Sequence, residues 1–145
     1  MTRGFPATLV DTDTLSAIMR RHPVARAVAQ AYLVQHHQWT LSLITRYEIL
    51  RGLYAKNAKT QLTAFQRLCA ANRLLPLSEE IVVQAAQMYG TLHRQGTLIG
   101  DADILIAATA QVHGLVVATN NTRHFERISG VQVTNWLDAA EYGTI

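Results

Sequence analysis

Hydrophobic residues form two kinds of pattern along the chain, short apolar runs and longer stretches with helical spacing. The runs 7–10 and 115–119 are apolar almost throughout, as buried parallel strands are. Shorter runs predict further strands over 39–43, 73–77 and 131–133. Most of these runs are separated by stretches in which apolar residues recur every three or four positions, the spacing of an amphipathic helix.

Six helices are predicted from this spacing. They cover about 12–19, 24–36, 42 or 45 to 53, 56–71, 79–94 and 101–112. Because strands alternate with helices, we expect a mostly parallel sheet with helices on both faces. No repeat, low-complexity tract or linker interrupts the pattern, so a single α/β domain over residues 1–145 is expected.

Short polar residues at the helix starts predict caps, because their side chains accept hydrogen bonds from unpaired backbone N–H groups. Thr12 or Asp13 is expected to cap the first helix, Ser78 the fifth and Asp101 the sixth. Gly114 is expected to end the sixth helix in a left-handed conformation.

Composition narrows the class of protein. A hydrophobic fraction of 49% and a charged fraction of 16% fit a globular chain. No apolar run is long enough to span a membrane and the N-terminus has no signal-peptide core, so we expect a cytoplasmic protein. The single cysteine, Cys69, excludes an internal disulfide and a cysteine-cluster zinc site. A net charge of +3 favours a polyanionic partner only weakly.

Five of the ten carboxylates lie where strands and helices meet or beside apolar residues. They are Asp11, Asp13, Glu48, Asp101 and Asp103. Asp11 ends a buried strand, and because Thr12 and Asp13 suit the cap better, a functional role is favoured for it. Glu48 alone fits a surface residue paired with Arg51, while Asp103 lies in a first helical turn that favours negative charge.

Oxygen ligands from separate junctions are typical of a hard-cation site for Mg²⁺ or Mn²⁺. The six histidines have no metal-ligand spacing and are expected to be surface or helix-end residues. The serines lack a nucleophile-elbow context, and neither a P-loop nor a dinucleotide-binding glycine motif is present.

Four segments together resemble the motifs of a known family. Leu9–Ser16, Ser42–Leu53, Ile99–Ala108 and Val117–Phe125 are similar, in order and spacing, to the motifs of PIN-domain ribonucleases of the VapC type, the toxins of type II toxin–antitoxin modules. The resemblance covers nearly the whole chain. It implies a three-layer α/β/α PIN-like fold and a Mg²⁺- or Mn²⁺-dependent RNA endonuclease that is inhibited by a cognate antitoxin and forms a homodimer.

The resemblance also implies the site residues. Asp11, Glu48 and Asp103 match the three acids that ligate the metal, and Asp101 is an additional acid nearby. Asn121 falls where many members carry a fourth acid, and its amide can orient a water or a ligand. Basic residues near the site are candidates to hold RNA phosphates, with a solvated surface role as the alternative for each: Arg46, Arg51, Arg94 and Arg123.

Two other functions remain open from the sequence. Asn121 is compatible with a PIN-like module that binds RNA or a protein partner without cutting it. A metal-dependent phosphatase on an unrelated α/β fold would also use clustered carboxylates. The apolar stripes over 24–33 and 62–69 are interpreted as core rather than as partner surfaces.

Overall fold

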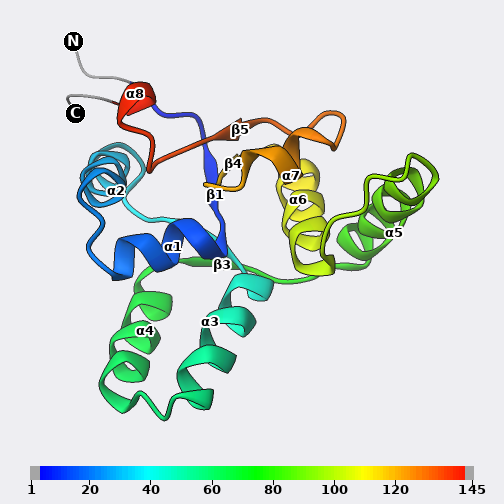
Figure 1. Cartoon of the computed structure of the whole chain (residues 1–145). Coiled ribbons are helices and arrows are strands. Elements are labelled where there is room, and N and C mark those ends of the chain that lie inside the picture. The colour runs from blue at the N-terminus through cyan, green and yellow to red at the C-terminus, as the bar shows by residue number, and fades with distance from the viewer. Residues whose placement is uncertain (1–3, 143–145) are drawn as a thin grey trace.

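The computed structural model describes residues 4–142, in which a five-stranded sheet lies between helices (Figure 1). The strands are β1 (Thr8–Val10), β2 (Thr40–Ser42), β3 (Arg73–Leu75), β4 (Val116–Ala118) and β5 (Val133–Thr134). Their order is β3-β2-β1-β4-β5, and every neighbouring pair is parallel. The predicted α/β class is confirmed, and the mostly parallel sheet is parallel throughout.

The order of the strands determines where a ligand site is expected. The chain moves outward from β1 through β2 to β3, and then returns to the other side of β1 to form β4 and β5. Open parallel sheets bind ligands outside the carboxyl ends of their strands, at the point where the strand order reverses. In this sheet that point lies between β1 and β4.

The helices confirm the six predicted ones and add two short ones. They are α1 (Thr12–Met19), α2 (Pro23–His36), α3 (Leu43–Ala55), α4 (Lys59–Ala71), α5 (Glu79–Arg94), α6 (Asp101–His113), α7 (Thr122–Glu126) and α8 (Ala139–Tyr142). Gly114 follows α6 with φ of 67°, the left-handed conformation that was predicted. Within residues 4–142 no helix has the length and apolar character to cross a membrane.

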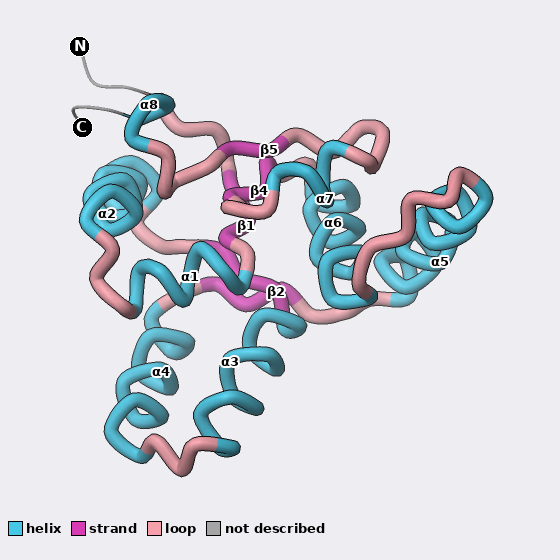
Figure 2. Tube along the Cα trace, viewed as in Figure 1, coloured by secondary structure: helices cyan, strands magenta, loops and turns pink. Residues whose placement is uncertain are grey.

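Two hydrophobic cores cover the two faces of the sheet. Figure 2 shows the strands in the middle of the molecule with the helices arranged around them. Neighbouring residues of β1 point to opposite faces, so Val10 packs with α1, α2 and α4 while Leu9 packs with α5, α6 and α7. Helix α3 contributes Ile49 to the first core and places Ile44 against the second. It therefore lies beside both layers, immediately after β2.

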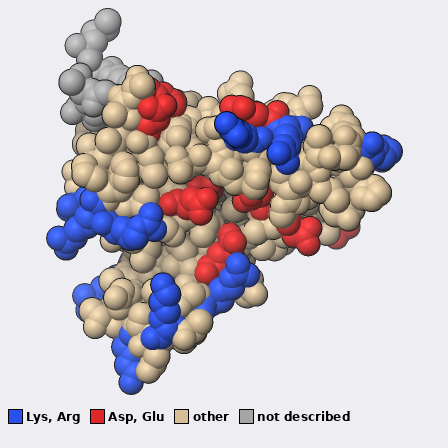
Figure 3. All heavy atoms as spheres, in the orientation of Figure 1, with Lys and Arg blue, Asp and Glu red and all other residues tan. Residues whose placement is uncertain are grey.

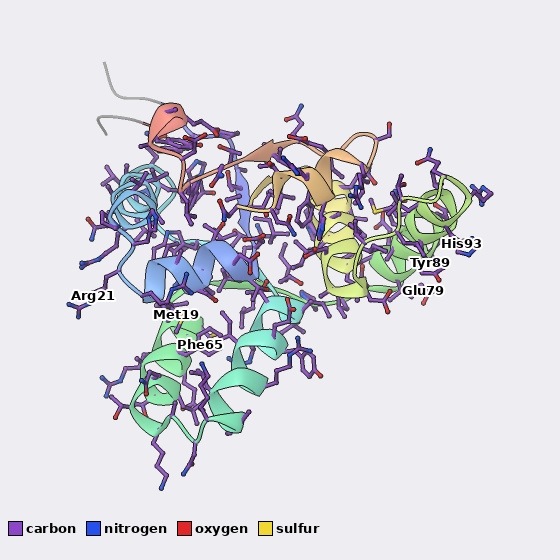
Figure 4. All side chains as sticks on the ribbon, in the orientation of Figure 1. Met19, Arg21, Phe65, Glu79, Tyr89 and His93 are labelled. Atoms are coloured by element: carbon purple, nitrogen blue, oxygen red, sulfur yellow. The ribbon has the colours of Figure 1, made fainter. Side chains whose placement is uncertain are left out.

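The apolar stripes of α2 and α4 belong to the first core, as predicted. Val28 and Tyr32 of α2 and Phe65 and Cys69 of α4 are buried there. Phe65 and Met19 lie between α4 and α1, whereas Arg21 points outward from the turn between α1 and α2 (Figure 4).

Two of the predicted caps are wrong. Asp11, rather than Thr12 or Asp13, is the N-cap of α1, because β1 ends at Val10 and leaves Asp11 extended, with its carboxylate accepting the Thr14 N–H at 2.8 Å. Gly100 precedes α6 without a side-chain cap, because Asp101 is already inside the first turn. Ser78 caps α5 as predicted, and Ser42 caps α3.

Candidate metal centre

Asp11 lies at the carboxyl end of the central strand and is only 3% exposed. Burial raises the pKa of its carboxyl from 3.8 to about 6, and hydrogen bonds from the Thr119 side chain and the Thr14 backbone partly oppose that rise. The nearby charge of Asp13 raises the pKa further. The backbone N–H of Asp11 donates to the carbonyl of Ala118 at 3.0 Å, so the residue is fixed to β4 as well. Asp11 is thus a rigidly placed, poorly solvated carboxyl group.

Glu48 is brought to the same edge of the sheet by α3. The hydroxyl of Thr12 donates to Glu48 Oε1 at 2.7 Å and lies 3.0 Å from the hydroxyl of Thr45, which is fully buried. A hydroxyl has one proton and a carboxylate only accepts, so Thr45 is the donor in the second contact. Two threonines therefore link the start of α1 to the first turns of α3 and orient Glu48.

The other oxygen of Glu48 faces Arg51. Arg51 Nη2 lies 3.6 Å from Glu48 Oε2, so the predicted pairing is confirmed, and the guanidinium also lies over the Tyr47 ring at 5.2 Å from its centroid. The Glu48 side chain is 20% exposed, so Glu48 is neither buried nor a freely solvated surface residue. One oxygen is held by α1 and the other by its own helix.

Asp103 enters the site from the first turn of α6. Its Oδ2 lies 3.0 Å from His124 Nδ1, and the same ring nitrogen lies 2.6 Å from the side-chain amide nitrogen of Asn121. Asn121 follows β4, and its backbone N–H donates to Thr119 Oγ1 at 2.9 Å. Residues 119–124 therefore connect Asp103 to the strand next to Asp11.

The two remaining candidate acids point elsewhere. Asp13 is exposed on α1 and affects Asp11 only through its charge. Asp101 is exposed and lines a hollow between α5 and α6 together with Ala85 and Tyr89. Tyr89 and His93 stack on the surface of α5, well away from the carboxyl edge of the sheet (Figure 4). The structure thus groups Asp101 with α5 and not with Asp103.

The chemistry of the donors at this edge fits a hard divalent cation. Asp11, Glu48 and Asp103 offer carboxylate oxygens from three different elements, and a cation would offset the cost of the charge on buried Asp11. Each carboxylate is held by a partner of its own. Across residues 4–142, no three His, Cys, Asp or Glu side chains lie close enough together to hold one ion. The side chains would have to move toward one another to bind it.

Four residues of this edge make contacts that the sequence does not predict. From the sequence, Thr12 fits a helix cap or a supporting partner of Asp11, Thr45 a helix start, Thr119 the end of a strand and His124 a surface histidine. Their roles depend on contacts with residues far away in the chain, such as His124 with Asp103. One signal was available, because all four stand within the motif segments that carry the resemblance, and Thr12 and Thr45 lie close in sequence to the candidate acids Asp11 and Glu48.

Basic residues surround the acids. Acidic side chains gather across the middle of one face, and basic side chains lie along its margins (Figure 3). A hollow of about 330 Å³ beside Glu48 is lined by Arg20 and Lys56 together with apolar side chains of α1 and α3. Among the four arginines considered above, Arg51 is paired with Glu48, and Arg94 lies at the far end of α5, where it donates to Thr91.

The fold and the acidic edge together describe a class of α/β domain with a candidate metal site at the point where the strand order reverses. Residues 8–131 match the PIN domain family. The chain therefore belongs to the PIN-domain family, and the similarity to VapC proteins that four motifs indicated is confirmed by its relatives.

The relatives extend over nearly the full chain. It is 33% identical to the VapC ribonuclease Y4jK of Sinorhizobium fredii over 134 residues, which cover 88% of this chain and 95% of that protein. It is 28% identical to the tRNA(fMet)-specific endonuclease VapC of Salmonella typhimurium over 129 residues, which cover 88% and 96%. The DNA-bound VapBC structure from Salmonella typhimurium superposes with a TM-score of 0.81 at 26% identity, covering 91% of this chain and 99% of that one.

Proposed function

We propose that this protein is a Mg²⁺- or Mn²⁺-dependent endoribonuclease and the toxin of a toxin–antitoxin pair. The observation that carries the proposal is the placement of Asp11, Glu48 and Asp103 at the carboxyl edge of a PIN-domain sheet, each oriented by its own hydrogen-bond partners. Relatives named as VapC ribonucleases and solved VapBC complexes support the activity and the role.

Asp11, Glu48 and Asp103 would hold the ion. A bound divalent cation would polarise the phosphodiester, activate a water and stabilise the leaving oxygen. The chain's own contribution is orientation. The cap bond to Thr14 and the Thr12 hydroxyl fix two of the carboxylates, and burial of Asp11 keeps bulk water away from it. Such fixed partners reduce the reorganisation needed when the reacting groups meet.

Arg20 and Lys56 place positive charge beside the acidic site. Both line the hollow next to Glu48, where RNA phosphates beside the acids would meet positive charge. The acids themselves repel RNA, so the basic margin is needed to bring the backbone close.

The partners are an RNA substrate and a cognate antitoxin. Solved neighbours of this fold are VapBC toxin–antitoxin complexes, which supports an antitoxin partner. The apolar lining of the hollow beside Glu48 suits a peptide segment inserted near the acids. A homodimer in the cytoplasm completes the proposal, and apolar residues exposed on α5, including Val82 and Tyr89, are available for pairing with a second copy.

The direct test is cleavage of RNA by the purified protein. Mg²⁺ or Mn²⁺ should support cleavage, EDTA should abolish it, and Asp11→Asn and Asp103→Asn should each remove it. Persistent cleavage in EDTA or in both variants would contradict the proposal. Hydrolysis of small phosphomonoesters with RNA left intact would instead indicate the phosphatase alternative.

A non-cleaving RNA-binding module is the second candidate. It is favoured by the amide at Asn121, where the family resemblance expects an acid, and by the separation of the three carboxylates. Metal-independent RNA binding by the wild-type protein, with no cleavage product in Mg²⁺ or Mn²⁺, would select it.

A further inference from the structure

The segment after β4 has a geometry that the ligand role of the three acids does not explain. Asn121 occupies the N-cap position of α7 but makes no side-chain cap bond. Its amide instead turns toward His124 at 2.6 Å, and His124 in turn faces Asp103 at 3.0 Å. The cap bond has been replaced by a contact that leads to an acid of the site.

The position of the ring proton follows from the partners of His124. Nδ1 faces both the Asp103 carboxylate and the Asn121 amide, and a carboxylate only accepts hydrogen bonds. Nδ1 therefore carries a proton, and this N–H donates a hydrogen bond to Asp103. The amide of Asn121 then presents its oxygen, not its nitrogen, to the same N–H, an orientation assigned from the hydrogen-bond partners.

The segment after β4 is also connected to Asp11. The Thr119 side chain donates a hydrogen bond to the Asp11 carboxyl and accepts one from the Asn121 backbone N–H at 2.9 Å. Thr119 is fully buried, so this connection is shielded from water. Asp11 and Asp103, which lie far apart in the sequence, are thus joined through Thr119, Asn121 and His124.

We propose that His124 and Asn121 are positioning residues that orient the Asp103 carboxylate at the metal centre, in place of the acid expected at 121. The inference rests on the proposed function, because it assigns these residues to the same metal centre. Outer partners that orient a ligand typically change metal affinity or activity 10–100-fold when they are removed.

The first experiment measures Mn²⁺ affinity by calorimetry. His124→Leu removes the donor with little change in size and should weaken Mn²⁺ binding about 10–100-fold. His124→Asn keeps an N–H in the place of Nδ1 and should restore most of the affinity, which a merely structural role of the ring would not predict. His93→Leu, an exposed histidine on α5, is the matched control and should bind Mn²⁺ like the wild type.

A double-mutant cycle with Asp103→Asn tests whether His124 acts through Asp103. Once Asp103 is changed, His124→Leu should cause no further loss of Mn²⁺ affinity. An equal additional loss in that background would mean that His124 acts independently, and wild-type affinity of His124→Leu alone would overturn the inference outright.

A readout without metal separates this inference from the proposed function. Imidazole nitrogen NMR of the metal-free protein should show His124 protonated at Nδ1, and Asp103→Asn or Asn121→Ala should disturb that signal. Protonation at Nε2 alone would overturn the inference even if RNA cleavage is observed. Failure of the proposed function would appear differently, as wild-type protein that neither binds Mn²⁺ nor cuts RNA. Such a result with the Nδ1 proton present would overturn the ligating role while the hydrogen bond to Asp103 stands.

Discussion

The Asp11 side chain caps a helix and is at the same time a buried carboxyl group. As the N-cap of α1 it accepts the Thr14 N–H, and as a carboxyl at the end of β1 it is nearly inaccessible to water. Burial is the main cause that disfavours its charge, and its pKa is therefore raised to about 6. When it is ionised, Asp11 therefore lowers the stability of the metal-free folded protein, and this cost is offset only when a cation is bound.

Asp11→Asn should raise stability while it removes RNA cleavage. Asparagine caps a helix about as well as aspartate and carries no charge. It therefore avoids the free-energy cost of ionising buried Asp11, which is about 3 kcal/mol for a pKa raised from 3.8 to about 6. Thermal unfolding at pH 8 in EDTA should show the gain, at about 2–4 °C per kcal/mol. Asp13→Asn, on the exposed side of α1, should leave the midpoint nearly unchanged. A lower midpoint for Asp11→Asn would contradict the account.

The raised pKa of Asp11 also predicts how the stability of the protein depends on pH. The folded-state pKa of Asp11, about 6, lies above its ordinary value of 3.8, so the folded state binds more protons between these values. The contribution of Asp11 to the free energy of unfolding should therefore fall as pH rises from about 4 to 6, and then level off. Urea unfolding in EDTA at pH 5 and pH 7.5 measures the change. Asp11→Asn should lack this component, and an identical pH dependence in both proteins would refute the assignment.

At the scale of elements, the start of α3 depends on α1. Thr12 donates to Glu48 and contacts Thr45, so one hydroxyl couples the first turns of two helices. This coupling sets the direction of Glu48 before any ligand arrives.

Thr12→Val should weaken the site without unfolding the protein. Glu48 would keep its pairing with Arg51 but lose the bond that directs Oε1, and metal affinity should fall about 10-fold or more. Mn²⁺ titration measures the loss. Thr12→Ser retains the hydroxyl and should bind Mn²⁺ nearly as the wild type does. Equal affinity of the valine and serine variants would argue against a positioning role for Thr12.

The end of α6 offers a test of backbone conformation. Gly114 has φ of 67°, and nothing within 4 Å would obstruct a Cβ, so Gly114→Ala carries only the left-handed conformational cost of about 1 kcal/mol. Gly52→Ala is the matched opposite, because this glycine lies inside α3 with equally open space and should gain about 0.5–1 kcal/mol. Denaturant unfolding should move the two variants in opposite directions.

The elements that were predicted well have strong local patterns. The run 115–119, which contains β4, is apolar almost throughout, and α5 has both a serine cap and a long apolar stripe. Helix α7 was missed because it has five residues and only Phe125 is buried, which leaves no periodicity to detect. The cap of α1 was misassigned because the local sequence does not specify whether β1 ends before or after Asp11.

The site could be predicted only in part for a related reason. Asp11, Glu48 and Asp103 were selected by their junctions and by the resemblance, and these positions stay predictions until metal binding is measured. The contact between His124 and Asp103 spans 21 residues and has no recurrent spacing, so no sequence pattern pointed to it. Hydroxyl groups that support the site, such as that of Thr119, have no sequence pattern either, and only their contacts in the folded structure identify them.

At the scale of the whole molecule, charge is divided between an acidic centre and basic margins (Figure 3). With a net charge of only +3, long-range attraction of RNA is modest, and binding must depend on particular basic side chains. Arg20 and Lys56 occupy the margin nearest Glu48.

Arg20→Ala and Lys56→Ala should each weaken RNA binding and reduce its salt dependence. One phosphate contact on a single strand contributes about 0.7 to the slope of log affinity against log salt. Binding is measured in an Asp103→Asn background with EDTA, so that no cleavage interferes. Arg94→Ala, at the distant end of α5, is the control and should leave the slope unchanged. Unaltered slopes for the first two variants would exclude phosphate contacts at the hollow.

The central position of β1 has a consequence for the timing of synthesis. Its partner β4 is made more than a hundred residues later, and the buried Trp136, which packs against Tyr32, later still. A nascent chain on the ribosome thus already contains Asp11 and Glu48 but lacks both Asp103 and the strand that completes their surroundings. The candidate centre therefore cannot assemble before β4 and Trp136 have been synthesised, and a nascent chain that stops short of them does not carry it.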